Sequence, residues 1–187
     1  MRGSWCYCTL PERQGYKTPQ DILWDLIDVV SKNGRLLLNF GPRPDGTLSD
    51  KDKEILAAIA GWMKVNDEAI HGTDLWRINQ EGPTEVAEGQ FADSQSRDFT
   101  SEDFRFTCSG SSVYAIAMVC PEDGVLRVKS LREADASRLP LYHGVIKGVE
   151  VLGCDKPVAW TRDSEALTVN LGDFRSDLPV VVKVVTE

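Results

Sequence analysis

A near-continuous apolar run in the segment RLLLNFGPRPDGT, residues 35–47, constrains the fold of this chain more than any other feature. Residues 36–40 of the segment read LLLNF, and a Gly-Pro turn follows them directly. A short apolar run bounded by turn signals is typical of a strand buried on both faces, as in parallel sheets covered by helices. An inner strand of this kind has a hydrogen-bonding neighbour on each edge. The fold therefore has to provide strands on both sides of residues 36–40.

Helices are predicted before and after this run. Thr18, Pro19 and Asp21 form a helix start, with Thr18 as the cap, Pro19 in the first turn and Asp21 reaching back. The helix ends at Asn33-Gly34, and its apolar stripe consists of Ile22, Leu23, Leu26, Ile27 and Val30. A second capping sequence, residues 49–52, opens a helix whose stripe consists of Ile55, Leu56, Ile59, Trp62 and Met63. Trp24 and Trp62 are expected in the core.

The order of elements in the first part of the chain is typical of a parallel sheet. Residues 4–9 are aromatic and small and are predicted to form a strand, so the first 70 residues read strand–helix–strand–helix. Two such units cannot close a sheet, and a closed barrel of this kind needs eight. Only one candidate neighbour for residues 36–40 is present, which indicates the C-terminal end of a larger fold.

The second part of the chain has a different pattern. Residues 80–101 are polar and contain glycine, and short alternating segments separated by turn signals follow them: 104–108, 113–119, 126–130, 148–152, 167–171 and 180–185. This spacing predicts an antiparallel β-sandwich. The expected fold class is α/β plus all-β, a partial (β/α)8-barrel remnant followed by the sandwich. The expected domains are a barrel remnant at 1–75, a linker at 76–101 and a sandwich at 102–187.

Composition excludes several functional classes. The 187 residues carry a net charge of −8, and no stretch rich in Lys and Arg provides a footprint for nucleic acid. No apolar run approaches the roughly 18 residues that cross a membrane. Cys6-x-Cys8 has the wrong spacing for a zinc site, and both histidines, His71 and His143, lie far from it. Nothing implies a metal or an organic cofactor.

The motifs resemble the C-terminal part of the α-L-fucosidases of glycoside hydrolase family twenty-nine. The resemblance rests on GSWCY at 3–7, on the stretch at 17–76 that contains VSKNGRLLLNFGPRPDGT, and on the segments at 103–131 and 144–153. It implies that residues 1–75 are the last two βα units of a catalytic (β/α)8 barrel, followed by the family's C-terminal β-sandwich. The missing neighbours of residues 36–40 are then earlier barrel strands.

The resemblance also implies where the chemistry lies. The family is one of retaining glycosidases, whose nucleophile and general acid/base are carboxyl groups about 5 Å apart. In the family both groups, and the histidines that line the sugar pocket, precede the position of Ser4. This chain is therefore expected to hold no catalytic residue and to be inactive alone. Its expected partners are a fucosylated glycan, as substrate of the full-length parent, and a missing N-terminal half of the barrel.

Trp5 is the residue that the resemblance assigns to substrate binding. The corresponding aromatic of the family stands at the end of its strand beside the sugar, where its face can pack on apolar sugar surface, including the 6-methyl group of fucose. The alternative is that Trp5 only fills the barrel core. Tyr7, two residues on, lies on the same side of the strand and is a weaker candidate.

Other polar residues near the predicted strand ends have structural interpretations. Glu12 and Asp45 lie in loops on the face where barrel active sites occur, but one carboxylate without a partner of shifted pKa does not hydrolyse a glycoside. They are therefore interpreted as solvated loop residues. Asn39 either positions a pocket loop or caps the turn at Gly41, and the second role is favoured. His71 and His143 are interpreted as surface or packing residues.

Two other functions remain open from the sequence. The sandwich could bind glycans by itself, which would require exposed aromatic residues on one face, or it could be a structural piece that completes a split glycosidase. The aromatic residues of the second part alternate into strands, as core residues do. Because the apolar sheet edge of residues 1–72 lacks partners, this part is expected to be poorly stable and to be trimmed by protease.

Overall fold

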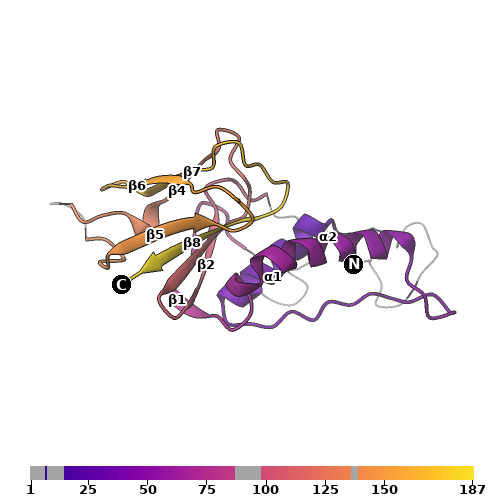
Figure 1. Cartoon of the computed structure of the whole chain (residues 1–187). Helices are drawn as coiled ribbons and strands as arrows, with labels where there is room; N and C mark the ends of the chain where they lie inside the picture. Colours follow the sequence, from indigo (N-terminus) through magenta and orange to yellow (C-terminus); the bar gives the residue numbers. More distant parts are fainter. Residues whose placement is uncertain (1–6, 8–14, 87–97, 136–138) are drawn as a thin grey trace.

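The computed structural model describes residue 7 and residues 15–86, 98–135 and 139–187, which form three layers (Figure 1). The helices are α1 (Pro19–Ser31) and α2 (Asp50–Asn66), which continues into the short 3-10 helix η2 (Asp67–Ala69). The strands are β1 (Asp74–Glu81), β2 (Phe104–Ser109), β3 (Ser112–Ala117), β4 (Val125–Val128), β5 (Ile146–Val151), β6 (Ala159–Arg162), β7 (Leu167–Asn170) and β8 (Val180–Thr186).

The capping signals of both helices act as predicted. The backbone N–H of Asp21 donates to Thr18 Oγ1 at 3.1 Å, and the Thr18 N–H donates back to Asp21 Oδ2 at 2.9 Å, which completes a capping box. At the other end Asn33 adopts a positive φ of 59°, and the Gly34 N–H donates to Val29 O at 2.8 Å. Ser49 caps α2 in the same way by accepting from the Asp52 N–H at 3.1 Å.

The predicted antiparallel β-sandwich is confirmed. Its larger sheet has the order β1-β2-β3-β8-β5 and its smaller sheet the order β4-β7-β6, and all recorded pairings are antiparallel. The core between the sheets includes Phe104, Phe106, Leu126, Leu167 and Val182, all inaccessible to solvent. Burial of such side chains is the main favourable term in the stability of the sandwich.

The larger sheet is covered on both faces. Val180, Val182 and Val184 of β8 point into the sandwich, whereas Val181 packs with Leu23 of α1 in a second apolar cluster on the helix side. This second cluster consists of Leu23, Ile27, Trp62, Ala69, Ile70, Phe99, Tyr114, Ile116, Met118 and Val181. A two-sided environment explains why residues 180–185 are apolar on both faces of the strand except at Lys183, although the sheet is antiparallel.

Two strands were not indicated by the sequence pattern. The sequence predicts a linker over 76–101, whereas Asp74–Glu81 form β1 at the edge of the larger sheet, paired with β2. The second is β6, whose four residues are half-buried or exposed. Edge strands bury little side-chain surface, so their apolar alternation is weak.

The run at 36–40 does not form a strand in this chain. Residues 34–43 have no regular secondary structure, and Leu37 exposes 75% of its surface. In Figure 1 this segment passes as extended chain below the two helices. None of the strands in the described part of the chain pairs with it. The described residues therefore provide no strand neighbour that would bury this run.

Among residues 15–86, 98–135 and 139–187, no helix is both long and apolar enough to span a bilayer.

Candidate functional site

The residues that the sequence analysis assigns to the sugar lie mostly outside the described residues. Trp5 and Glu12 both belong to the part of the chain that is not described, so their roles stay predictions. Tyr7 is half-buried and has no regular secondary structure. Asn39 is also half-buried, in the extended segment before α2.

Asp45 has a structural role in its turn. Its Oδ1 accepts hydrogen bonds from the Thr47 N–H at 2.9 Å and from Thr47 Oγ1 at 2.7 Å. These bonds to Thr47 lower the pKa of the Asp45 carboxyl group. A general acid of a glycosidase needs the opposite shift, because it must hold its proton near neutral pH. The geometry therefore agrees with a loop carboxylate that stabilises a turn.

The histidines are surface residues. His71 bonds through Nδ1 to the carboxylate of Asp67 one helical turn earlier, and both side chains are exposed. His143 is exposed in the segment before β5. Both positions agree with the interpretation of these histidines as surface or packing residues.

The described residues form a closely packed junction between the two helices and the larger sheet of the sandwich. Trp24 of α1 donates from Nε1 to Met118 O at 2.7 Å, at the end of β3. Trp62 of α2 donates from Nε1 to Pro179 O at 2.8 Å, just before β8. The prediction that both tryptophans lie in the core is confirmed for Trp62, which is buried, while Trp24 is half-buried. Each indole thus joins apolar packing to a directed hydrogen bond.

A buried ion pair crosses the same junction. Arg105 of β2 has no solvent-exposed surface, and its Nε donates to Asp28 Oδ1 of α1 at 2.7 Å. Lys32 approaches the other carboxylate oxygen of Asp28 at 3.0 Å. Burial by itself would raise the pKa of Asp28, but the hydrogen bonds and charges of Arg105 and Lys32 outweigh it, so this pKa lies below its ordinary value.

A third contact fixes the end of the helix layer. Glu68 Oε2 accepts from the hydroxyl of Tyr114 at 3.0 Å and from Lys183 Nζ at 2.7 Å, and these two residues lie on neighbouring strands β3 and β8. Burial, together with the nearby carboxylate of Glu68, raises the pKa of Tyr114. The phenol is therefore a neutral hydrogen-bond donor at physiological pH.

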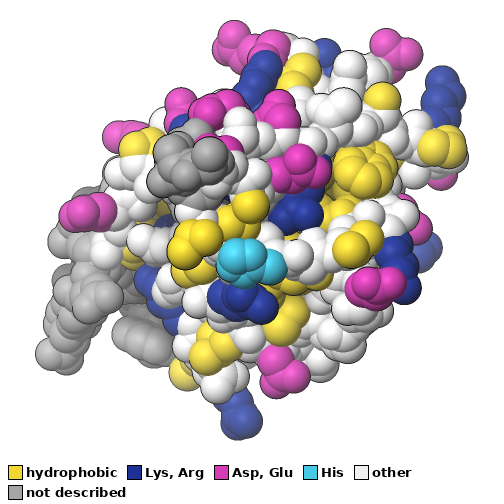
Figure 2. Space-filling model, turned by 90° about the vertical axis from the view of Figure 1, so that its left-hand side faces the viewer, with side chains coloured by type: hydrophobic (Ala, Val, Ile, Leu, Met, Phe, Trp, Pro, Cys, Tyr) yellow, Lys and Arg dark blue, Asp and Glu magenta, His cyan; other side chains and the backbone are white. Residues whose placement is uncertain are grey.

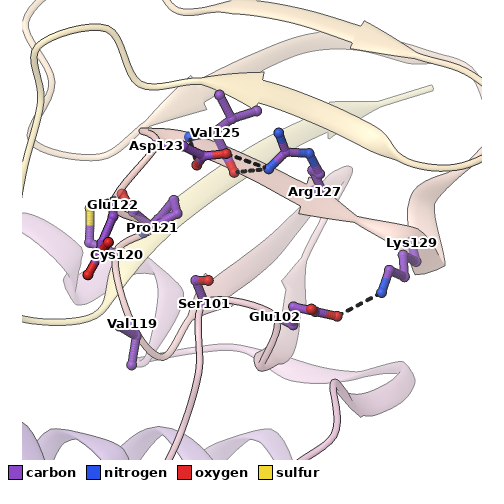
Figure 3. Close-up of a pocket in the computed structure, with 10 residues that line it drawn as sticks. All are labelled: Ser101, Glu102, Val119, Cys120, Pro121, Glu122, Asp123, Val125, Arg127 and Lys129. Carbon is purple, nitrogen blue, oxygen red and sulfur yellow. Dashed lines mark hydrogen bonds and ion pairs between the residues drawn. The ribbon is translucent and has the colours of Figure 1, made fainter.

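A surface hollow near this junction lies at one end of the sandwich (Figure 3). It has a volume of about 540 Å³ and is lined by Ser101, Glu102, Val119, Cys120, Pro121, Glu122, Asp123, Val125, Arg127 and Lys129. Two ion pairs stand on its rim, Glu102–Lys129 at 2.9 Å and Asp123–Arg127 at 3.0 Å. No pattern in the sequence indicates this hollow, because its residues come from two separate segments, 101–102 and 119–129.

The chain matches two family models. The alpha-L-fucosidase model matches residues 1–68, and the model of the alpha-L-fucosidase C-terminal domain matches residues 96–181. Among curated relatives, the tissue alpha-L-fucosidase of Homo sapiens is 30% identical over 145 residues, covering 78% of this chain and 25% of the relative. The Mus musculus tissue alpha-L-fucosidase is 26% identical over 162 residues, covering 87% of this chain and 30% of the relative.

Solved structures share the fold. The alpha-fucosidase of Thermotoga maritima superimposes with a TM-score of 0.69 at 23% identity, covering 97% of this chain and 37% of that chain. Alpha-L-fucosidase isoenzyme 1 from Paenibacillus thiaminolyticus gives a TM-score of 0.68 at 22% identity, and the match covers 98% of this chain and 37% of that chain.

Two helices joined by an extended apolar segment and docked on an antiparallel sandwich form the fold that this chain shares with part of the solved alpha-fucosidases. The chain belongs to the α-L-fucosidase family and corresponds to its C-terminal part. It spans 25–30% of the length of the relatives named above.

Proposed function

We propose that this chain provides the last two βα units and the C-terminal β-sandwich of a retaining α-L-fucosidase that releases terminal α-L-fucose from glycoconjugates. The nucleophile and the acid/base then belong to upstream barrel residues that this sequence does not include. The chain alone is catalytically incomplete, and Trp5 contributes an aromatic face beside the sugar.

The observation that carries this proposal is the state of residues 36–40. The segment is as apolar as an inner barrel strand, yet Leu37 is 75% exposed and no described strand pairs with it. Leaving such a run in water is unfavourable, because each buried Leu side chain stabilises a fold by about 1.5–3 kcal/mol. Earlier strands of a barrel would supply both the hydrogen bonds and the burial.

Within this proposal the sandwich is a rigid support for the barrel. The helices that would cover the end of the barrel are held on the sheet by Trp24, Trp62 and the Asp28–Arg105 ion pair. Because strand positions depend on the helices that cover them, the sandwich would help to fix the geometry of the last barrel strands. We place the boundary between barrel remnant and linker near residue 75.

An independent glycan-binding module is the weaker candidate. The large apolar side chains that are exposed in the described residues are Leu37, Val65, Leu75, Leu139 and Val145, and none is aromatic. Trp76, Trp160 and Phe174 pack against the sandwich core. Figure 2 shows the end of the molecule away from the helices, where apolar side chains form small groups among charges of both signs. Among the described residues, the exposed large apolar side chains thus offer no aromatic platform for sugar stacking.

The test uses 4-nitrophenyl α-L-fucoside. The chain alone should release no 4-nitrophenol above background, whereas the chain extended at its N-terminus by the upstream part of an α-L-fucosidase barrel should turn the substrate over. The upstream part without this chain is the control and should be inactive or much less active. Clear turnover by the chain alone, or full activity of the upstream part alone, would overturn the proposal.

A further inference from the structure

The hollow between the β3–β4 loop and β4 has the size and the lining of a small-ligand site. Its volume of about 540 Å³ falls within the range of protein pockets that take small molecules. Val119, Pro121 and Val125 supply apolar surface, and the charged residues stand around them (Figure 3). The site is therefore amphipathic.

The charged groups come as donor–acceptor pairs. Lys129 Nζ lies 2.9 Å from Glu102 Oε2, and Arg127 Nη1 lies 3.0 Å from Asp123 Oδ2. Each pair presents an acceptor beside a donor, which is the arrangement that two neighbouring sugar hydroxyl groups require. With Glu122 the lining carries three acids and two bases, so it does not select for an anionic ligand.

The orientation of α1 shows which end of the junction the hollow occupies. Asp28 contacts Arg105, which pairs with Ile116, and one helical turn earlier Trp24 contacts Met118. Moving toward the N-terminal end of α1 thus leads along β3 toward residue 119 and the hollow.

The orientation of α2 is the same. Ala69 contacts Thr107, which pairs with Tyr114, whereas Trp62 contacts Pro179 beside the Ala117 end of β3. The N-terminal ends of both helices therefore point toward the end of the sheet that carries the hollow.

The direction of the extended segment between α1 and α2 indicates on which side the active-site end of the barrel would lie. The extended segment runs from the C-terminal end of α1 to the N-terminal end of α2, so its own carboxyl end lies on the side of the hollow. Barrel enzymes carry their active sites at the carboxyl ends of the strands. The hollow thus faces the side of the molecule from which a glycan would enter.

We propose that this hollow is a subsite for the neutral saccharide to which the fucose is attached. The inference rests on the proposed function and adds the substrate class: oligosaccharides long enough to reach the sandwich. The pairs Glu102–Lys129 and Asp123–Arg127 hold hydroxyl groups of that saccharide, and Val119, Pro121 and Val125 contact its C–H surface.

The subsite is weak by itself. The lining contains no aromatic ring, and the ion pairs are exposed to water, so binding near the millimolar range, about 4 kcal/mol, is expected for the saccharide alone. The subsite strengthens substrate binding when the linked fucose is held in the barrel at the same time. The saccharide then meets the hollow as part of an already bound molecule, so its binding is effectively intramolecular.

Binding is tested on the chain alone, by ¹H–¹⁵N NMR titration with lactose as the saccharide. Backbone signals of residues 119–129 should shift, and Lys129→Ala should weaken the response about threefold or more. Lys147→Ala is the matched control, because Lys147 forms a similarly exposed pair with Glu187 outside the hollow. Absent shifts at 119–129, or equal effects of both variants, would overturn the subsite.

Activity of the extended enzyme provides a second measurement. Lys129→Ala should raise KM for a fucosylated lactose about threefold or more and leave KM for 4-nitrophenyl α-L-fucoside unchanged. Equal effects on both substrates would overturn the subsite. Because lactose binding needs no turnover, an inactive enzyme that still binds lactose would contradict the proposed function, whereas an active enzyme without lactose binding would contradict only the subsite.

Discussion

Arg105 of β2 and Asp28 of α1 form an ion pair in the interior, with Nε and Oδ1 at 2.7 Å, although the two residues are 77 positions apart in the chain. A buried guanidinium group is tolerated only with a partner, so the sandwich depends on the docked helix. We therefore expect the helices and the sandwich to fold as one unit, although they match two different family models.

Asp28→Ala should destabilise the chain strongly. The change leaves the charge of Arg105 buried and uncompensated, which costs about 3–5 kcal/mol in the free energy of unfolding. Urea unfolding followed by tryptophan fluorescence measures the effect. Lys51→Ala, which removes an exposed pair with Glu54, should change the free energy of unfolding by less than about 0.5 kcal/mol.

The double variant Asp28→Leu/Arg105→Met separates charge from packing. Replacing both charges by apolar side chains of similar volume is often neutral or stabilising, so most of the stability lost in Asp28→Ala should return. A double variant as unstable as Asp28→Ala would show that the pair is not what holds the helix on the sheet.

Acid should weaken the same contact. Because the pKa of Asp28 is lower in the folded chain, the carboxylate contributes stability above its unfolded pKa of about 4, and this contribution is lost as the pH falls through the folded value. The difference in unfolding free energy between wild type and Asp28→Asn should reach its maximum by about pH 6 and should decrease below about pH 4. A difference that stays constant with pH would argue against this ion pair.

Trp62→Phe tests the second junction contact. The variant keeps an aromatic ring but leaves the buried carbonyl of Pro179 without its donor, a loss of about 1–3 kcal/mol. Lys64→Ala, on the exposed side of the same helix, should change the unfolding free energy by about 0.5 kcal/mol or less. Thermal unfolding followed by circular dichroism measures the loss of stability in each variant. Equal losses in Trp62→Phe and Lys64→Ala would argue against a stabilising hydrogen bond from Trp62.

Limited proteolysis should cut the extended segment and spare the helices. The sequence alone predicts that protease trims residues 1–72, but α1 and α2 share an apolar cluster with the sandwich. We now expect cleavage within 34–48, with the two products eluting together in gel filtration. Loss of the whole region before residue 72, with an intact sandwich left behind, would contradict the docked arrangement.

The sequence was sufficient to predict the helices and strands whose signals lie within a few residues of each other. Thr18 and Asp21 determine the start of α1 through bonds over three residues, and Ser49 does the same for α2. Turn residues and alternation likewise located six of the strands. In each case the physical cause lies within one turn or one strand of the residue concerned.

Contacts between distant segments could not be predicted in this way. Arg105 stands in FRFTCS, where alternation indicates a solvent-exposed side chain, yet it is fully buried because Asp28 neutralises it. The weakly amphipathic edge strand β1 and the hollow at Glu102–Lys129 also depend on segments that only the fold brings together.

Hydrogen exchange at residues 36–40 shows whether this run is an inner strand of a barrel that upstream residues complete. No strand in the described part of the chain pairs with residues 36–40, so in the chain alone the amides of residues 36–38 and 40 should exchange at close to the rate of unfolded peptide. In the chain extended by the upstream barrel, the amides of residues 36–40 should exchange about 100-fold more slowly or slower still, as expected of an inner strand. Strong protection in the chain alone, or no protection in the extended chain, would contradict the assignment of residues 36–40 to a barrel strand.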